Sequence, residues 1–168
     1  MVQAEYTASE MREILRRLFP ERRLVLSQFT FFNHSGITKP SGLSYKRGRR
    51  CFCLVDILPI AVVLTLKEQG IPLKNANRVP LLVQEKAQEI LSFNQTYRLT
   101  GFGSHLCLTT LADPQPNIPL EYFLNETKGD TLFWGLDLSA VAQNLLRAIN
   151  GETIISEAFV DDLELVAA

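Results

Sequence analysis

Four cationic side chains fall within five consecutive positions of the chain, residues 46–50. Lys46, Arg47, Arg49 and Arg50 flank Gly48, and glycine is a residue that marks turns. The pattern predicts two short strands joined as a hairpin with a basic tip. Because ammonium and guanidinium groups contact the phosphates of a nucleic-acid backbone, this density of charge favours phosphate contact over a solvated loop.

Short polar side chains precede the hairpin, in a helix predicted over about residues 27–34. Ser27 is its expected N-cap, Phe29 and Phe32 supply its apolar face, and Gly36 follows its end. A helix with small polar side chains can enter the major groove of DNA and read base edges. The predicted base-reading residues are Ser27, Gln28, Thr30, Asn33 and His34, and the other predicted DNA contacts are Lys39, Tyr45, Lys46, Arg47, Arg49 and Arg50.

Residue patterns of catalysis and metal binding are missing from the sequence. It contains no G-x-x-x-x-G-K-[ST] loop, no nucleophile elbow and no H-E-x-x-H, and it has only 2 histidines. Cys51 and Cys53 are closer than the usual zinc or redox spacing, and on a strand they point to opposite faces. Buried packing is the better interpretation of both. We therefore predict no enzyme, no cofactor and no metal.

Charge is divided unevenly along the chain. Residues 1–80 carry 13 Lys and Arg against 6 Asp and Glu, a net charge of +7. Residues 81–168 carry 4 against 12, a net charge of −8. A basic half suggests contact with a polyanion, and the acidic half is expected to pair with another copy or hold a protein partner.

Targeting and membrane signals are also missing. The longest apolar stretch, Val55–Leu66, is interrupted by Asp56, Pro59 and Thr65, and the N-terminus has no basic or apolar leader region. The expected location is the cytoplasm, without membrane contact.

The elements that position the polar residues follow from apolar spacing. Thr7 and Glu10 form a capping box before a helix whose apolar side chains are Met11, Ile14, Leu15 and Leu18. Another helix is predicted from about 54 to 69, with one buried stripe. Its Pro59 is harmless if Asp56 is the N-cap and kinks the helix if the helix starts earlier. A short helix is expected to open at Pro72.

Pro80 is the predicted domain boundary, because composition and charge both change there. A helix is predicted over about 81–91, then strands over 97–101, 105–111 and 131–136, a helix over 139–149 and a strand over 154–160. The chain is thus predicted to be α+β, with a winged helix-turn-helix in residues 1–80 and a small α+β domain in residues 81–168.

Two groups allow alternative interpretations. Arg16, Arg17, Arg22 and Arg23 are either a solvated face or part of a contact surface. Trp134, with Phe102 and Phe133, either lines an effector pocket or, as we favour, packs against the predicted helix over 139–149.

Several motifs, in order, resemble the DNA-binding domain of MerR-type regulators. Ser35–Pro40 is similar to the x-G-L-x-x-P that follows their recognition helix, and Gly48–Phe52 resembles their wing motif. Asp56-Ile57 resembles the Asp-Leu that opens their next helix, and Leu66–Leu73 resembles the junction after it. The resemblance covers about residues 6–80 and implies a winged helix-turn-helix that binds double-stranded DNA.

The sequence departs from that family at three places. The second helix has Phe31-Phe32 and no arginine, residues 19–24 are extra, and Pro80 interrupts the position of the long dimerisation helix. The family's effector sites, dimer geometry and promoter-twisting mechanism are therefore not carried over.

The leading hypothesis is a homodimeric, sequence-specific transcription regulator. One alternative is a protein-interaction adaptor whose winged helix no longer reads DNA. Another is an excisionase-like architectural factor that bends DNA with weaker sequence preference.

Overall fold

The structure is a computed structural model that describes residues 5–25, 28, 45–46, 49–71, 78–102, 105–110, 112 and 133–154. In chain order its elements are β1 (Glu5–Thr7), α1 (Ala8–Leu18), β2 (Tyr45–Lys46), β3 (Arg49–Cys53), α3 (Leu54–Glu68), α4 (Arg78–Ser92), β4 (Tyr97–Phe102), β5 (His105–Thr110), β6 (Phe133–Asp137) and α6 (Leu138–Ile149).

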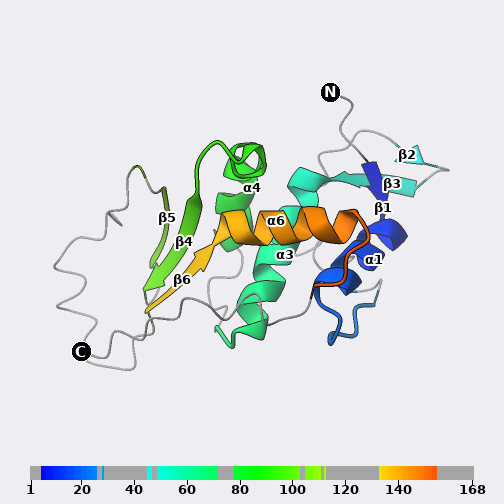
Figure 1. Cartoon of the computed structure of the whole chain (residues 1–168), viewed down its shortest axis with the longest axis horizontal. Coiled ribbons are helices and arrows are strands. Elements are labelled where there is room, and N and C mark those ends of the chain that lie inside the picture. Colours follow the sequence, from blue (N-terminus) through cyan, green and yellow to red (C-terminus); the bar gives the residue numbers. More distant parts are fainter. Residues whose placement is uncertain are drawn as a thin grey trace.

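The described strands form two small antiparallel sheets, with the helices between them (Figure 1). The first sheet has the order β1-β3-β2 and the second has the order β5-β4-β6. The two sheets lie toward opposite ends of the molecule. The predicted α+β class is confirmed.

Helix α1 begins and packs as its sequence predicts. The backbone N–H of Thr7 donates to the Glu10 carboxylate at 2.6 Å, and the N–H of Glu10 donates to the Thr7 hydroxyl at 3.3 Å. The predicted capping box is therefore confirmed. The buried side chains are the four that the spacing indicates: Met11, Ile14, Leu15 and Leu18.

Helix α3 is buried on all sides, which corrects the expectation of one buried stripe. Every residue from Val55 to Leu66 is buried, because α1, β3, α4 and α6 all contact this helix. Asp56 is not the N-cap. The helix starts at Leu54, so Pro59 lies in its interior and cannot donate to the carbonyl of Val55, four residues before it.

Pro80 lies inside α4, where the sequence predicts a domain boundary. It is buried in the first turn of the helix, a place where proline costs little because the first N–H groups have no intrahelical partner. Buried side chains from both sides of residue 80 belong to one hydrophobic cluster. Residues 1–80 and 81–168 thus do not enclose two separate cores.

The second half follows its predicted elements closely. The three predicted strands over 97–101, 105–111 and 131–136 correspond to β4, β5 and β6, and the predicted helix over 139–149 corresponds to α6. Asp137 caps α6, since its carboxylate accepts from the N–H groups of Ser139 and Ala140 at 2.8 and 3.1 Å.

Helix α6 joins the two ends of the molecule. It contacts β4, α4 and α3, and it also packs on α1 (Figure 1). The Arg17 guanidinium donates to the carbonyl of Ala148 at 3.1 Å, and the N–H of Ile154 donates to the carbonyl of Arg17 at 2.9 Å. The N-terminal helix is therefore held by residues more than a hundred positions later.

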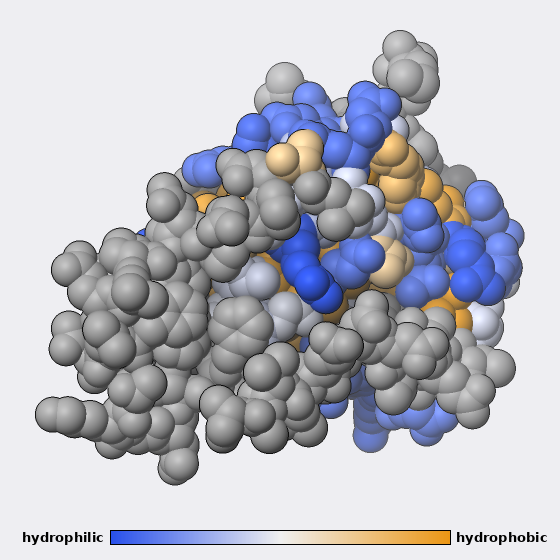
Figure 2. Space-filling model, turned by 60° about the vertical axis from the view of Figure 1, so that its left-hand side comes forward, coloured by the Kyte–Doolittle hydropathy of each residue, from blue (hydrophilic) through white to orange (hydrophobic). Residues whose placement is uncertain are grey.

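The described surface is mostly polar. On the face drawn in Figure 2, hydrophilic residues border small hydrophobic patches. The large exposed apolar side chains are Val25, Leu81 and Phe93. In the described ranges, no helix combines the length and the apolar character needed to cross a bilayer. The helix expected at Pro72 and residues 155–160 of the last predicted strand lie outside the described residues.

Candidate nucleic-acid interface

The basic hairpin predicted from the sequence is present as an antiparallel pair of strands. Tyr45 of β2 lies opposite Arg50 of β3, and Lys46 lies opposite Arg49. Residues 47 and 48 connect the paired ends, which is the shortest common hairpin connection. Lys46, Arg49 and Arg50 thus lie in the paired strands next to the connection, and Arg47 belongs to the connection itself.

Strand β1 is a third strand that sequence reasoning missed. It pairs with β3 on the side away from β2, with Tyr6 opposite Phe52 and Thr7 opposite Cys51. Only three residues long, β1 shows no readable alternation of apolar and polar side chains. The available signal was Tyr6 and Thr7, two residue types that favour strands, directly before the first helical residue.

The sheet fixes the hairpin to two helices. Thr7, the last residue of β1, is the N-cap of α1, and Cys53, the last residue of β3, is the N-cap of α3. The N–H of Cys53 donates to the buried Asp56 carboxylate at 2.8 Å. Cys51 and Cys53 are both buried, which confirms their predicted packing role.

Gln28, a predicted base-reading residue, makes two contacts with Val25. Its backbone N–H donates to the Val25 carbonyl at 3.0 Å, and its side-chain oxygen accepts from the Val25 N–H at 3.1 Å. This is the relation of an N3 residue to an N-cap. Gln28 is helical, and Ser27, the predicted N-cap, lies outside the described residues.

The Gln28 contact also limits what its exposed side chain can read. The side-chain oxygen is engaged by Val25, which leaves the amide N–H₂ to donate to a ligand. The predicted contacts Ser27, Thr30, Asn33, His34, Lys39 and Arg47 lie outside the described residues. The structure describes the backbone pairing of four other predicted contacts: Tyr45, Lys46, Arg49 and Arg50.

The arginines in α1 and in the segment just after it fall into two groups according to what they contact. Arg17 is structural, since it donates to the end of α6. Arg12, Arg16, Arg22 and Arg23 instead line a hollow of about 400 Å³, which we call the arginine hollow; its other lining residues are Glu13, Pro20, Glu21 and Leu24. The sequence left a solvated face and a contact surface as alternatives here.

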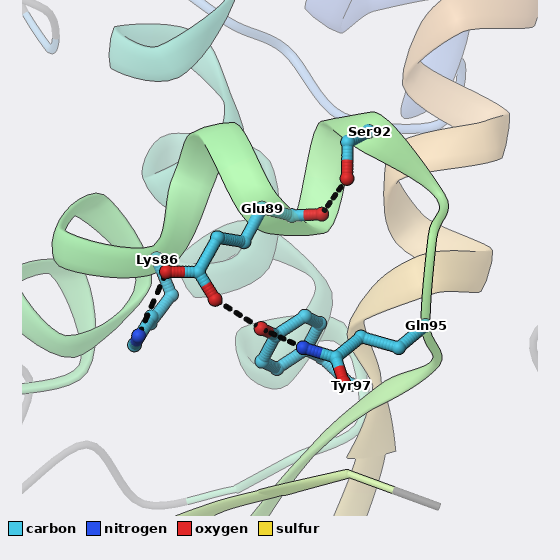
Figure 3. Close-up of polar contacts among 5 residues, drawn as sticks. All are labelled: Lys86, Glu89, Ser92, Gln95 and Tyr97. Carbon is cyan, nitrogen blue, oxygen red and sulfur yellow. Dashed lines mark hydrogen bonds and ion pairs between the residues drawn. The ribbon is translucent and has the colours of Figure 1, made fainter.

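A polar network in the second half joins α4 to β4 (Figure 3). The Lys86 ammonium and the Glu89 carboxylate form an ion pair at 2.8 Å. The Tyr97 hydroxyl donates to the other Glu89 oxygen and accepts from the side-chain N–H₂ of Gln95. The Ser92 hydroxyl donates to the Glu89 carbonyl at 2.7 Å, near the end of the helix.

The charges of this network suit a structural role. The hydrogen bond from Lys86, and then that from Tyr97, lowers the pKa of Glu89, so its carboxylate stays ionised. The bond to Glu89 and burial raise the pKa of Tyr97, so its phenol stays protonated. A general acid or base needs a pKa near the working pH, and both groups are shifted away from it. The network holds β4 against α4.

The favoured interpretation of Trp134, packing against the helix over 139–149, is confirmed only in that this side chain is buried in the core. It belongs to the hydrophobic core cluster, but its indole lies over Gly101 of the neighbouring strand β4. Within the parts of the chain that the structure describes, no three His, Cys, Asp or Glu side chains come together as a metal site.

Comparison of the chain with protein-family models and with curated protein sequences gives no match. The function has to be argued from the residues and their geometry.

Proposed function

We propose that this protein is a sequence-specific, double-stranded-DNA-binding transcription regulator. In this proposal the helix that contains Gln28 enters the major groove, and the hairpin of β2 and β3 follows the phosphates. The observation that carries the proposal is the sheet β1-β3-β2, which ties a hairpin dense in cations to the capped starts of two helices. A hairpin held in this way has its paired strands fixed relative to α1 and α3.

Charge gives this interface its expected affinity. The hairpin supplies Lys46, Arg47, Arg49 and Arg50, and each phosphate contact releases condensed counterions. Two copies would supply roughly eight contacts, enough for strongly salt-dependent binding. In the proposal, the acidic residues 81–168 provide the homodimer contact or hold a protein partner, since like charge keeps them away from DNA.

The test is fluorescence anisotropy of the full chain against a pool of random duplexes at two salt concentrations, followed by sequencing of the bound pool. We expect salt-sensitive binding and an enriched palindrome, because a two-fold dimer selects two half-sites. Binding without enrichment would favour the architectural factor. No binding at low salt would contradict the proposal and favour the protein-interaction adaptor, in line with the engagement of the Gln28 oxygen by Val25.

Replacing Arg49 and Arg50 by alanine tests the hairpin itself. We expect weaker binding to every duplex and a salt slope shallower by about two, since two phosphate contacts are lost. Arg98→Ala on β4, an exposed arginine of the opposite sheet, is the control for loss of charge. Equal affinity of the double variant and the unaltered protein would remove the hairpin from the interface.

A further inference from the structure

The arginine hollow has an excess of positive charge. Its lining contains four arginines and two glutamates. Glu13 serves two of the arginines, with distances of 3.6 Å to Arg12 and 3.2 Å to Arg16. The positive charge of the lining is therefore only partly neutralised.

The arginines of the hollow differ in whether a carboxylate pairs with them and in how exposed they are. Arg22 is paired with Glu68 at the end of α3, at 3.6 Å, which fastens the segment after α1 to the central helix. The Arg16 side chain is 66% exposed in spite of its ion pair. Arg23 is exposed and forms no ion pair with any residue that the structure describes. Arg16 and Arg23 are thus available to an outside anion.

The hollow directly precedes the helix proposed to read DNA. Leu24 is buried and lines the hollow, and the next residue, Val25, makes both backbone contacts with Gln28. Arg23 is therefore five residues before Gln28, a helical residue predicted to read bases. In helix-turn-helix docking, the N-terminal residues of the recognition helix meet base edges while the first helix crosses the backbone. A turn between these helices lies close to phosphates.

We propose that the arginine hollow binds a phosphodiester group of the DNA backbone beside the recognition helix, as a second phosphate contact separate from the hairpin. This inference rests on the proposed function. Guanidinium groups match phosphate oxygens through paired hydrogen bonds, and no carboxylate among the described residues pairs with Arg23. Residues 19–24, which are extra relative to MerR-type regulators, would then supply a contact of this chain's own.

The experiment measures duplex affinity and its salt dependence for Arg23→Gln and Arg16→Gln in the full chain. Each is expected to weaken binding several-fold and to make the salt slope shallower by about one. Arg98→Gln removes the same charge on the opposite sheet and is expected to leave both quantities unchanged. Glu21→Gln removes a negative charge from the lining and is expected to tighten binding. Thermal unfolding of each variant verifies that the fold is retained.

The outcomes separate this inference from the proposed function. If the Arg49/Arg50 double variant weakens binding but Arg16→Gln and Arg23→Gln do not, the hollow is only a solvated face and the inference is overturned. If the hollow variants weaken binding and the hairpin variant does not, the inference stands and the hairpin assignment falls. If the unaltered protein binds no duplex, both fall. Binding of inorganic phosphate without duplex binding would assign the hollow to a free anion and overturn the DNA contact.

Discussion

At the scale of single residues, Gly101 has the least room for a side chain among the glycines that the structure describes. A Cβ atom there would lie 2.2 Å from Cε2 of the Trp134 indole, which belongs to the cross-strand neighbour. The indole is buried in the core, so it cannot swing aside freely. The absence of a side chain at residue 101 therefore leaves the space that the Trp134 indole fills.

Gly101→Ala is expected to destabilise the protein by about 1–3 kcal/mol, because the added methyl group overpacks a filled site. Urea unfolding measures the loss, and the single tryptophan of the chain reports the shift of the indole by fluorescence. Gly135→Ala on β6 is the matched control, because its nearest neighbour would be Arg98 Nε at an ordinary 3.5 Å. Equal stability of the two variants would contradict the packing described for Trp134.

The Glu89 carboxylate predicts an acid dependence of stability. Its hydrogen bonds to Lys86 and Tyr97 lower its pKa below the ordinary value of 4.5, so the unfolded chain takes up the proton first. The contribution to stability is present above pH 4.5 and is lost as the pH falls through the lower, folded-state pKa. Glu89→Gln is expected to remove this part of the acid dependence.

Urea unfolding at a series of pH values checks this prediction. Glu85→Gln on the same helix is the control, because Glu85 is exposed and its side chain makes no hydrogen bond or ion pair with another described residue. A Glu89→Gln variant with an unchanged slope below pH 4.5 would show that the ion pair and the Tyr97 bond are too solvated to matter.

At the scale of elements, the start of α3 determines where the hairpin lies. The Asp56 carboxylate is fully buried and accepts from the N–H of Cys53, the residue at which β3 ends. The sequence predicted a helix from about residue 54 and left open whether Asp56 is its N-cap; the structure has Cys53 as the N-cap and Asp56 at the third helical position. An aspartate carboxylate accepts backbone N–H groups both at the N-cap and at the third helical position. The folded structure shows that Asp56 accepts from Cys53 and therefore holds the third position.

Asp56→Ala is expected to cost about 1–3 kcal/mol, since it leaves the buried Cys53 N–H without this acceptor. Asp56→Asn keeps an acceptor oxygen and should cost less. Thr7→Ala, at the exposed cap of α1, is expected to cost about 1 kcal/mol and sets the scale for a cap in water. Urea unfolding compares the three, and an Asp56→Ala loss below that of Thr7→Ala would contradict the buried cap.

At the scale of the whole molecule, α3 is the centre of a single core. The helix is apolar on every side, so it requires cover from all directions. Helices α4 and α6 supply that cover from the second half, and α6 also holds α1. The basic half of the chain is therefore completed by the acidic half.

A fragment of residues 1–80 is expected not to fold on its own, because it would expose the α3 surfaces that α4 and α6 cover. Circular dichroism and urea unfolding of the fragment and of the full chain test this, and the full chain is the control. A sharp, cooperative transition of the fragment would show that the predicted division at residue 80 marks an independent domain.

Local patterns predicted most of the elements. The capping box and apolar spacing of α1, the hairpin, the individual strands of the second sheet and α6 were each predicted from patterns within a few neighbouring residues. The pairing of β1 with β3 joins residues more than forty positions apart, so no window of sequence contains it. The arginine hollow depends in the same way on how the segment after α1 folds back.

The sequence by itself determined the α+β class, the capped helices and the concentration of positive charge in residues 46–50, because these follow from neighbouring side chains and composition. Only the tertiary structure decided that both halves share one core, that β1 completes the hairpin sheet and that Arg17 is structural while Arg23 has no ion pair with a described residue. The physical reason is that burial and ion pairing are properties of side chains brought together by folding, and arginines close together in the sequence differ only in what the rest of the chain places beside them.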